Sequence, residues 1–123
     1  MQNKFLGLRT VIFRVPDLEK AKNWYADVLG FAPYFDEVFY VGFEVSGYEL
    51  GLIPEEGKSA KGESITVYWG VENVKETYKM LIEKGAKEDE KPNEVGSGII
   101  VASVRDPWEN ILGIIYNPHF KLS

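Results

Sequence analysis

Residues 10–31 read TVIFRVPDLEKAKNWYADVLGF, a stretch that joins a strand pattern to a helix pattern. Its first six residues are mostly β-branched or aromatic, which favours a strand, and Pro16 ends that strand because proline has no amide hydrogen to donate within a sheet. Asp17 can then cap a helix, since its carboxylate can accept a hydrogen bond from the first turn. Apolar residues recur at helical spacing as far as Gly30, a residue that suits a helix end. The stretch therefore predicts a strand followed by an amphipathic helix.

The first half of the sequence continues with strands. Residues 32–53 consist of short apolar pieces separated by polar turns, which predicts about three strands, the last of them at 48–53. Residues 55–64 are polar and show no periodicity, so we interpret them as a linker. The first half, about residues 7–54, therefore predicts one βαβββ unit.

The second half repeats the same order of elements. Residues 65–71 predict a strand, and Asn73 with its helix-capping side chain opens a helix that ends at Gly85. After a polar stretch, two further apolar strands are predicted at residues 99–104 and 111–116. We therefore expect a second βαβββ unit over about residues 65–118. The fold class that follows is α+β, a single domain of 123 residues made of two tandem βαβββ units.

Composition and charge exclude several classes of function. A chain of 123 residues fits one compact domain. The absence of cysteine excludes disulfides and thiolate chemistry, and a chain without disulfides is typical of a reducing compartment. The net charge of −5 and the pI near 4.9 oppose binding to nucleic acid, which needs clustered basic residues. No apolar run approaches the roughly 20 residues that span a bilayer. We expect a cytoplasmic protein that binds neither nucleic acid nor membranes.

Two motifs resemble those of a known superfamily. The quoted stretch 10–31 is similar to the opening strand and helix of the vicinal-oxygen-chelate superfamily, which includes glyoxalases, bleomycin-resistance proteins and extradiol dioxygenases, and DPWENILGII at 106–115 is similar to its closing hairpin. The resemblance covers about residues 9–118. It implies that the two units form an open-barrel cleft, often within a homodimer. Because this fold also carries lyases, dioxygenases, thiol transferases and drug-binding proteins, the resemblance does not fix the chemistry.

The resemblance also implies where a metal would be held. Metal-using members take histidine and carboxylate ligands from the first and last strand of each unit, and these positions fall on Thr10, Thr66, Gly113 and a residue of strand 48–53. That residue is Glu49 in one register and Gly51 in the other. Threonine and glycine cannot replace imidazole or carboxylate, so the ligand set is incomplete. We expect no metal and no other cofactor, although a divalent metal held by an atypical set stays open as an alternative.

Strand alternation predicts which side chains face the cleft, because neighbouring residues of a strand point to opposite sides. Residues of the same parity as Thr10 and Thr66 should face the cleft, and the residues between them should pack on the helices. Alternation places Ile12, Arg14, Glu49, Tyr68 and Ile115 on the cleft side, and the family's ligand positions add Thr10, Thr66 and Gly113. Tyr40 and Trp108 complete the predicted ligand-binding residues as aromatic side chains around the pocket. The expected core residues of these strands are Val11, Phe13, Val67, Trp69, Leu112 and Ile114.

Two charged residues of this set have alternative roles. Arg14 falls where the resemblance implies an arginine that holds a glutathione carboxylate, but it also fits a solvated or ion-paired strand residue. Glu49 would act as a general base if its pKa were raised in an apolar cleft. It would otherwise serve as a counter-ion for a cationic ligand, or as a rim carboxylate paired with Arg14. The acidic run at 88–90 is expected in a loop that faces water and receives no role.

Residues 34–48 are rich in aromatic side chains, and half or more of these are expected in the core. The first hypothesis is a metal-free homodimer that binds a small aromatic or cationic molecule in an acidic aromatic cleft, as the bleomycin-resistance and mitomycin-binding side of the superfamily implies. The alternative is a lactoylglutathione-lyase-like enzyme with Glu49 as the catalytic base. A third hypothesis is a structural or regulatory dimer without a ligand.

Overall fold

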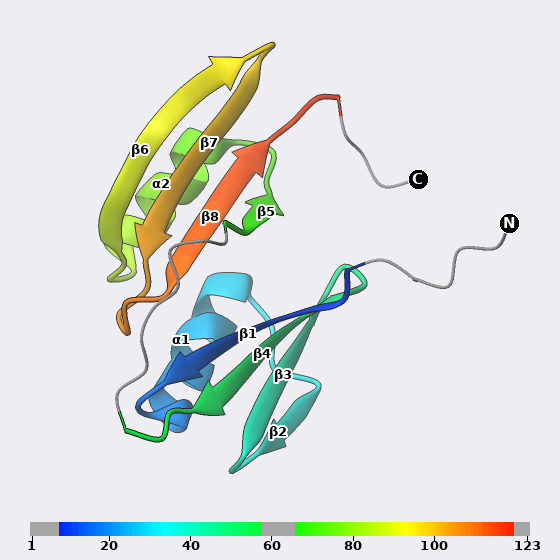
Figure 1. The fold of residues 1–123 in the computed structure, drawn as a ribbon, viewed down its shortest axis with the longest axis vertical. Helices are drawn as coiled ribbons and strands as arrows, with labels where there is room; N and C mark the ends of the chain where they lie inside the picture. Colours follow the sequence, from blue (N-terminus) through cyan, green and yellow to red (C-terminus); the bar gives the residue numbers. More distant parts are fainter. Residues whose placement is uncertain (1–7, 58–65, 120–123) are drawn as a thin grey trace, which may run out of the picture. The chain divides into compact units, whose positions relative to one another are not determined.

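The computed structural model describes residues 8–57 and 66–119 and divides the chain into two compact units, residues 1–59 and 60–123. The first unit contains β1 (Thr10–Val15), α1 (Leu18–Leu29), β2 (Phe35–Glu37), β3 (Tyr40–Val45) and β4 (Tyr48–Pro54) (Figure 1). The second contains β5 (Tyr68–Gly70), α2 (Val74–Glu83), β6 (Lys87–Gly96), β7 (Ile99–Arg105) and β8 (Ile111–Tyr116). This order confirms the predicted α+β class with two tandem βαβββ units.

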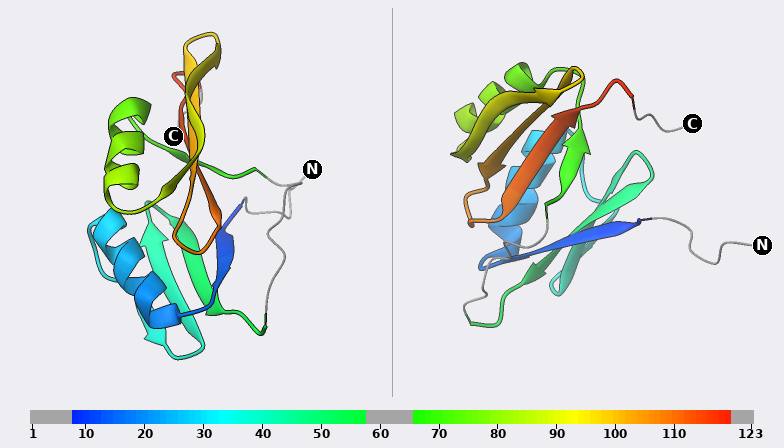
Figure 2. Two further views of the ribbon diagram at one scale, coloured as in Figure 1. Left: turned by 90° about the vertical axis from the view of Figure 1, so that its left-hand side faces the viewer. Right: turned by 45° about the horizontal axis from the view of Figure 1, so that its top comes forward.

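Each unit is a four-stranded mixed sheet with one helix on one face. The strand orders are β1-β4-β3-β2 and β5-β8-β7-β6, with the first pair of each sheet parallel and the other pairs antiparallel. Figure 2 shows that each helix covers one face of the sheet of its own unit. The opposite face carries no helix of the same unit, and we call it the open face. Neither helix is long and apolar enough to cross a membrane, a finding that covers the described ranges only.

The helix ends follow the predicted capping residues. The Asp17 side chain accepts a hydrogen bond from the Lys20 amide at 3.1 Å, and Gly30 ends α1 in a left-handed conformation with φ 87°. Asn73 accepts from the Glu76 amide at 3.0 Å in the same way at the start of α2. Local chemistry is sufficient for these three boundaries because each cap depends only on residues within one turn of the helix. The fourth, the end of α2, lies at Glu83 with Lys84 as the C-cap, two residues before the predicted Gly85.

The core lies between each helix and its sheet. In the first unit Tyr25 of α1 and four residues of β3 and β4 are at most 1% exposed: Val41, Phe43, Leu50 and Leu52. Leu112 and Ile114 of β8 are buried as expected. In contrast, four expected core residues in or next to β1 and β5 are only half-buried: Val11, Phe13, Val67 and Trp69. These two strands are sheet edges with a partner on one side only, which leaves their side chains more exposed.

The acidic run at 88–90 was expected in a loop, and this expectation is wrong. These residues lie in β6, the edge strand that pairs with β7. Most β6 side chains are exposed, so its sequence lacks the apolar alternation that marks a half-buried strand. Charged side chains are common on edge strands because they prevent association with other strands. The predicted strand at 65–71 is also shorter, since β5 covers Tyr68–Gly70 and residue 65 lies outside the described residues.

The turn between β7 and β8 is built around one buried carboxyl group. Asp106 is 0% exposed, and its Oδ1 accepts hydrogen bonds from the backbone amides of Trp108 and Asn110 at 2.9 and 2.8 Å. Its Oδ2 accepts from the Asn110 side chain at 3.1 Å. The aspartate and asparagine of the closing motif therefore hold the hairpin, and their role is structural. Trp108, predicted as a ligand-binding residue, lies half-buried in this turn.

Candidate functional site

The open face of the first sheet gathers several of the predicted site residues. The parallel pair of β1 and β4 places Thr10 beside Glu49, Ile12 beside Gly51 and Arg14 beside Ile53. By strand alternation these six residues share one face, opposite the buried Leu50 and Leu52. Ile12 is 48% exposed, which fits a position on an uncovered face.

The strand pairing resolves the two registers that the sequence left open. In the second unit Tyr68 lies beside Gly113, and in the first unit Ile12 lies beside Gly51. Ile12 and Tyr68 are equivalent residues of the two first strands when Thr10 is laid on Thr66, so Gly51 is the counterpart of Gly113. Glu49, two residues earlier, corresponds to Ile111. Glu49 thus lies two residues along the strand from the position that the family resemblance assigns to a metal ligand.

The Glu49 carboxylate is bound by hydroxyl groups from three places in the first unit. Its Oε1 accepts a hydrogen bond from Thr10 Oγ1 at 2.9 Å, and its Oε2 accepts from Tyr34 Oη at 2.5 Å. The Tyr40 hydroxyl also donates to this carboxylate. Within the described residues Glu49 forms no bond with Arg14, the partner expected in one interpretation of the sequence. We call Glu49 with these three hydroxyl groups the hydroxyl–carboxylate cluster.

Two glycines create the space for the tyrosine rings. Gly42 of β3 and Gly51 of β4 lie opposite each other in the antiparallel pair, and both are buried. A Cβ atom on Gly51 would lie 2.8 Å from Cζ of Tyr40, and one on Gly42 would lie 2.9 Å from Cε1 of Tyr34. Real Cβ atoms do not approach other atoms this closely. The paired glycines therefore form a flat floor on which the two rings lie.

The cluster keeps its carboxylate ionised and its phenols protonated. The hydrogen bond from Tyr34 lowers the pKa of Glu49 below its ordinary value, although partial desolvation acts in the opposite direction. Desolvation and then the hydrogen bond to Glu49 raise the pKa of Tyr40 to about 12, and the hydrogen bond to Glu49 raises the pKa of Tyr34. At neutral pH the cluster is one negative charge surrounded by hydroxyl donors. A general base needs the opposite shift, toward neutral pH.

Exposed aromatic rings continue from the cluster toward the β2–β3 turn. The Phe35 ring lies 6.4 Å from that of Tyr34, 5.9 Å from that of Tyr40 and 6.1 Å from that of Phe39, with interplanar angles of 55° to 66°. Tyr34 is 64% exposed and Phe39 62%, so these rings are available to a ligand. Phe43, from the same aromatic segment, is instead fully buried in the core.

Tyr34 and Phe35 belong to the aromatic-rich stretch of the sequence but were not among the predicted ligand-binding residues. Tyr34 precedes β2, so no strand parity assigned it to a face, and its backbone amide is held by the Gly42 carbonyl at 2.9 Å. The one signal for this contact was the pair of glycines in neighbouring predicted strands, because glycine within a strand often marks the close approach of another group.

The second unit has its own open face. The Tyr68 ring lies over Gly113, where a Cβ atom would lie 2.8 Å from the ring and 2.6 Å from the Val67 carbonyl oxygen. Ile115 is half-buried, and Thr66 is exposed and precedes β5. The Ser103 hydroxyl on β7 donates a hydrogen bond to the Asp89 carboxylate on β6 at 2.6 Å. One member of the acidic run is therefore bound to the neighbouring strand.

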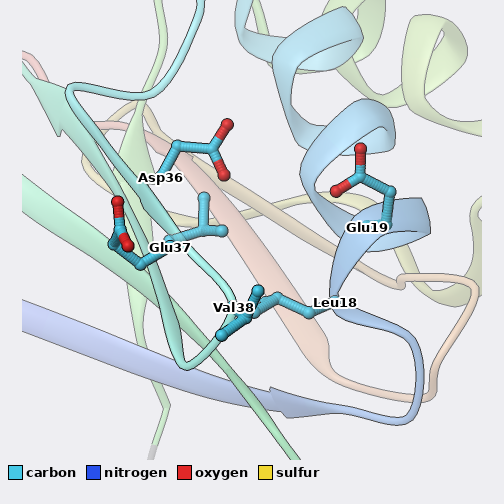
Figure 3. A pocket seen from close by; sticks show the side chains of 6 residues that line it. Leu18, Glu19, Asp36, Glu37 and Val38 are labelled. Carbon is cyan, nitrogen blue, oxygen red and sulfur yellow. The ribbon is translucent and has the colours of Figure 1, made fainter.

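A separate hollow of about 310 Å³ lies on the helix side of the first unit (Figure 3). It is lined by Leu18 and Glu19 of α1 and by Asp36, Glu37, Val38 and Val41 of the β2–β3 hairpin. Lys22 bridges Glu19 and Asp36, with 3.0 Å between its Nζ and a carboxylate oxygen of each. Two of the three carboxylates thus already have a cationic partner, and the hollow is a weak candidate for a cation site.

The residues at the family's metal positions do not fit a metal. Thr10 and Thr66 supply no imidazole, and the space in which a carboxylate side chain would start at Gly51 and Gly113 is filled by the rings of Tyr40 and Tyr68. Across residues 8–57 and 66–119, no group of three or more His, Cys, Asp or Glu side chains could hold a metal. The single histidine, His119, is exposed and places Nε2 2.8 Å from the Ser97 carbonyl oxygen.

Comparisons with known proteins identify the fold independently. The model of the glyoxalase/bleomycin resistance protein/dioxygenase superfamily matches residues 7–114. A glyoxalase-related enzyme from Fulvimarina pelagi has a similar structure, with 18% identity, a TM-score of 0.80 and coverage of 97% of this chain and 94% of that one. A lactoylglutathione lyase from Agrobacterium tumefaciens is also similar, with 16% identity, a TM-score of 0.74 and coverage of 96% and 98%. No curated protein matches the chain significantly. Identities this low establish the fold and leave the ligand to the site itself.

Proposed function

We propose that this chain, which belongs to the glyoxalase/bleomycin resistance protein/dioxygenase superfamily, binds a small aromatic cation on the open face of its first unit. One observation carries the proposal: an ionised carboxylate, Glu49, lies among exposed aromatic rings and is oriented by hydroxyl groups. The binding needs no metal, because Glu49 itself supplies the negative charge. Its tyrosine partners supply flat apolar surfaces.

The charge and the rings favour the same class of ligand. A carboxylate attracts a cation directly, and the faces of tyrosine and phenylalanine rings attract cations through their electron density. The net charge of −5 adds a long-range attraction for positive ligands and disfavours anionic ones. Exposed rings at the end of the cluster, Phe35 and Phe39, offer stacking partners for an aromatic portion of the ligand.

The same electrostatics separate binding from catalysis. The lactoylglutathione-lyase-like alternative assigns Glu49 the role of a base that removes a proton near neutral pH. Hydrogen bonds from Tyr34, Thr10 and Tyr40 lower the pKa of Glu49 and weaken it as a base. The arrangement therefore supports a counter-ion better than a base.

We also propose a homodimer in the cytoplasm as the working form. The superfamily resemblance implies the dimer, and the exposed apolar side chains of the β2–β3 turn, with Val38 at 91% exposure, support a surface that another chain covers. Light scattering coupled to size-exclusion chromatography tests this part of the proposal, and a monomeric mass would reject it.

The ligand proposal is tested with a pair of probes that differ in charge but hardly in shape. N-methylquinolinium is a planar cation, and quinoline is its neutral counterpart at pH 7. Titrations followed by NMR or fluorescence should show the cation binding at least roughly tenfold more tightly, the factor that about 1.4 kcal/mol of cation–π and charge attraction provides.

Two carboxylate-to-amide variants identify the residue that produces the preference for N-methylquinolinium over quinoline. Glu49→Gln should remove most of the preference for the cation. Glu44→Gln removes the same charge from the same face, since Glu44 is the residue directly opposite Glu49 on β3, and should retain most of the preference. Equal binding of both probes, or equal losses in both variants, would reject Glu49 as a specific counter-ion.

A further inference from the structure

The hydrogen bonds of the cluster restrict which cations can bind. A carboxylate offers about four lone-pair positions, and the hydroxyl groups of Thr10, Tyr34 and Tyr40 already donate to three of them. Glu49 is therefore a nearly saturated hydrogen-bond acceptor that still carries a full negative charge. A ligand can therefore be attracted by the negative charge of Glu49 but can form few hydrogen bonds to its carboxylate.

This saturation acts differently on different ammonium groups. A primary ammonium has three N–H donors that are strongly hydrated, and it loses water partners that the cluster cannot replace. A quaternary ammonium has no N–H group, is weakly hydrated, and presents methyl groups that pack against ring faces. Its positive charge is attracted to Glu49 and to the rings without any hydrogen bond.

The rings are arranged to accept such a group. Tyr34 and Tyr40 lie on the floor of Gly42 and Gly51, and the rings of Phe35 and Phe39 are inclined to their neighbours by 62° to 66°. Inclined rings present faces and edges in several directions around one region, as in the aromatic sites that recognise quaternary ammonium ligands. Each phenol that donates to the carboxylate also gains electron density in its ring, which strengthens its attraction for a cation.

We propose that the first unit selects quaternary ammonium ions over primary ammonium ions. The inference rests on the proposed function, the binding of an aromatic cation beside Glu49, and specifies the chemical class of that ligand. The hydroxyl groups of Thr10 and Tyr34 are the specificity-determining groups, because they occupy the positions that an N–H donor would need.

A series of benzyl ligands tests this selectivity on the complete chain. Benzyltrimethylammonium and benzylammonium are both cations at pH 7, and benzyl alcohol is a neutral control with the same ring. We expect benzyltrimethylammonium to bind roughly tenfold more tightly than benzylammonium, with benzyl alcohol the weakest. Affinities are measured by NMR titration, which detects millimolar binding and locates it on the chain.

The outcomes separate the inference from the proposed function. If both cations bind equally and more tightly than the alcohol, the cation site stands and the selectivity is wrong. If neither cation binds more tightly than the alcohol, the proposed function itself fails. If benzylammonium binds more tightly than benzyltrimethylammonium, the Glu49 carboxylate still accepts N–H donors and is not saturated, which overturns the inference.

Variants that free the carboxylate provide the decisive test. Tyr34→Phe and Thr10→Val each remove one hydroxyl donor to Glu49 with little change in shape. Each variant should bind benzylammonium more tightly relative to benzyltrimethylammonium. The ratio of the two affinities should fall from roughly tenfold to about threefold or less. Tyr48→Phe is the matched control, since Tyr48 alternates to the other side of β4 and its hydroxyl does not reach Glu49. An unchanged ratio in both donor variants, with chemical shifts that show a native fold, would overturn the inference.

Discussion

A single methyl group added to the floor of the site should destabilise the protein. In Gly51→Ala the new Cβ atom would lie 2.8 Å from Cζ and 2.9 Å from Cε1 of Tyr40, and even closer to its hydroxyl oxygen. The Tyr40 ring must then move, which removes its packing on the sheet and its hydrogen bond to Glu49. Overpacking of this kind costs about 1–3 kcal/mol of unfolding free energy.

This cost converts into a measurable change in melting temperature. An unfolding entropy of about 2.1 cal/mol/K per residue gives roughly 0.26 kcal/mol/K for 123 residues that unfold together, so 1 kcal/mol corresponds to about 4 °C. Gly51→Ala should therefore lower the melting temperature by about 4–12 °C, measured by circular dichroism. Urea unfolding followed by tryptophan fluorescence gives the free energy directly.

Gly70→Ala is the matched control for this substitution. Gly70 also lies in a strand, but a Cβ atom there would meet nothing within 4 Å. Its replacement should be neutral or slightly stabilising, because alanine lowers the entropy of the unfolded chain.

A double-mutant cycle assigns the cost of Gly51→Ala to the Tyr40 ring. In a Tyr40→Ala background the cost should fall by at least about 1 kcal/mol. Equal effects of the two glycine substitutions, or full additivity with Tyr40→Ala, would show that the ring does not lie over Gly51.

Three further predictions follow from the same structure. Hydrogen bonds, chiefly from Tyr34, lower the pKa of Glu49 below 4.5, so N-methylquinolinium affinity should be constant near neutral pH and fall only as the pH drops through that lowered pKa. The stability that Glu49 contributes should be lost in the same acidic range. A decline in affinity already at pH 6 would contradict this prediction. The buried Asp106 carboxylate accepts hydrogen bonds from the Trp108 amide, the Asn110 amide and the Asn110 side chain, and Asp106→Asn replaces one of its acceptor oxygens with a donor. This substitution should lower the free energy of unfolding by about 1–3 kcal/mol, measured by urea unfolding. A change of less than about 0.5 kcal/mol would contradict the structural role of Asp106 in the turn. Exhaustive dialysis against EDTA should leave N-methylquinolinium affinity unchanged, whereas a loss that a divalent ion restores would show a metal in the site.

The helices and the order of elements follow from the sequence alone. Asp17, Gly30 and Asn73 define helix ends because capping involves only neighbouring residues, and β-branched runs specify strands through their own alternation. The same local logic places Leu112 and Ile114 in the core. It failed for β6, whose charged residues form an edge strand only because β7 is available to pair with it.

The site depends on strand register, which the sequence left open. Glu49 lies beside Thr10 and Gly51 beside Ile12 only once β1 and β4 are paired, and a shift of two residues would move Glu49 to the family's ligand position. Tyr34 reaches Glu49 from outside any predicted strand, across 15 residues of chain. Contacts of this kind are set by long-range pairing and by the space that glycines leave, and neither is encoded in the periodicity of a single segment. Local sequence patterns therefore specify which side chains line the strands, whereas strand pairing in three dimensions places the Glu49 carboxylate among hydroxyl donors.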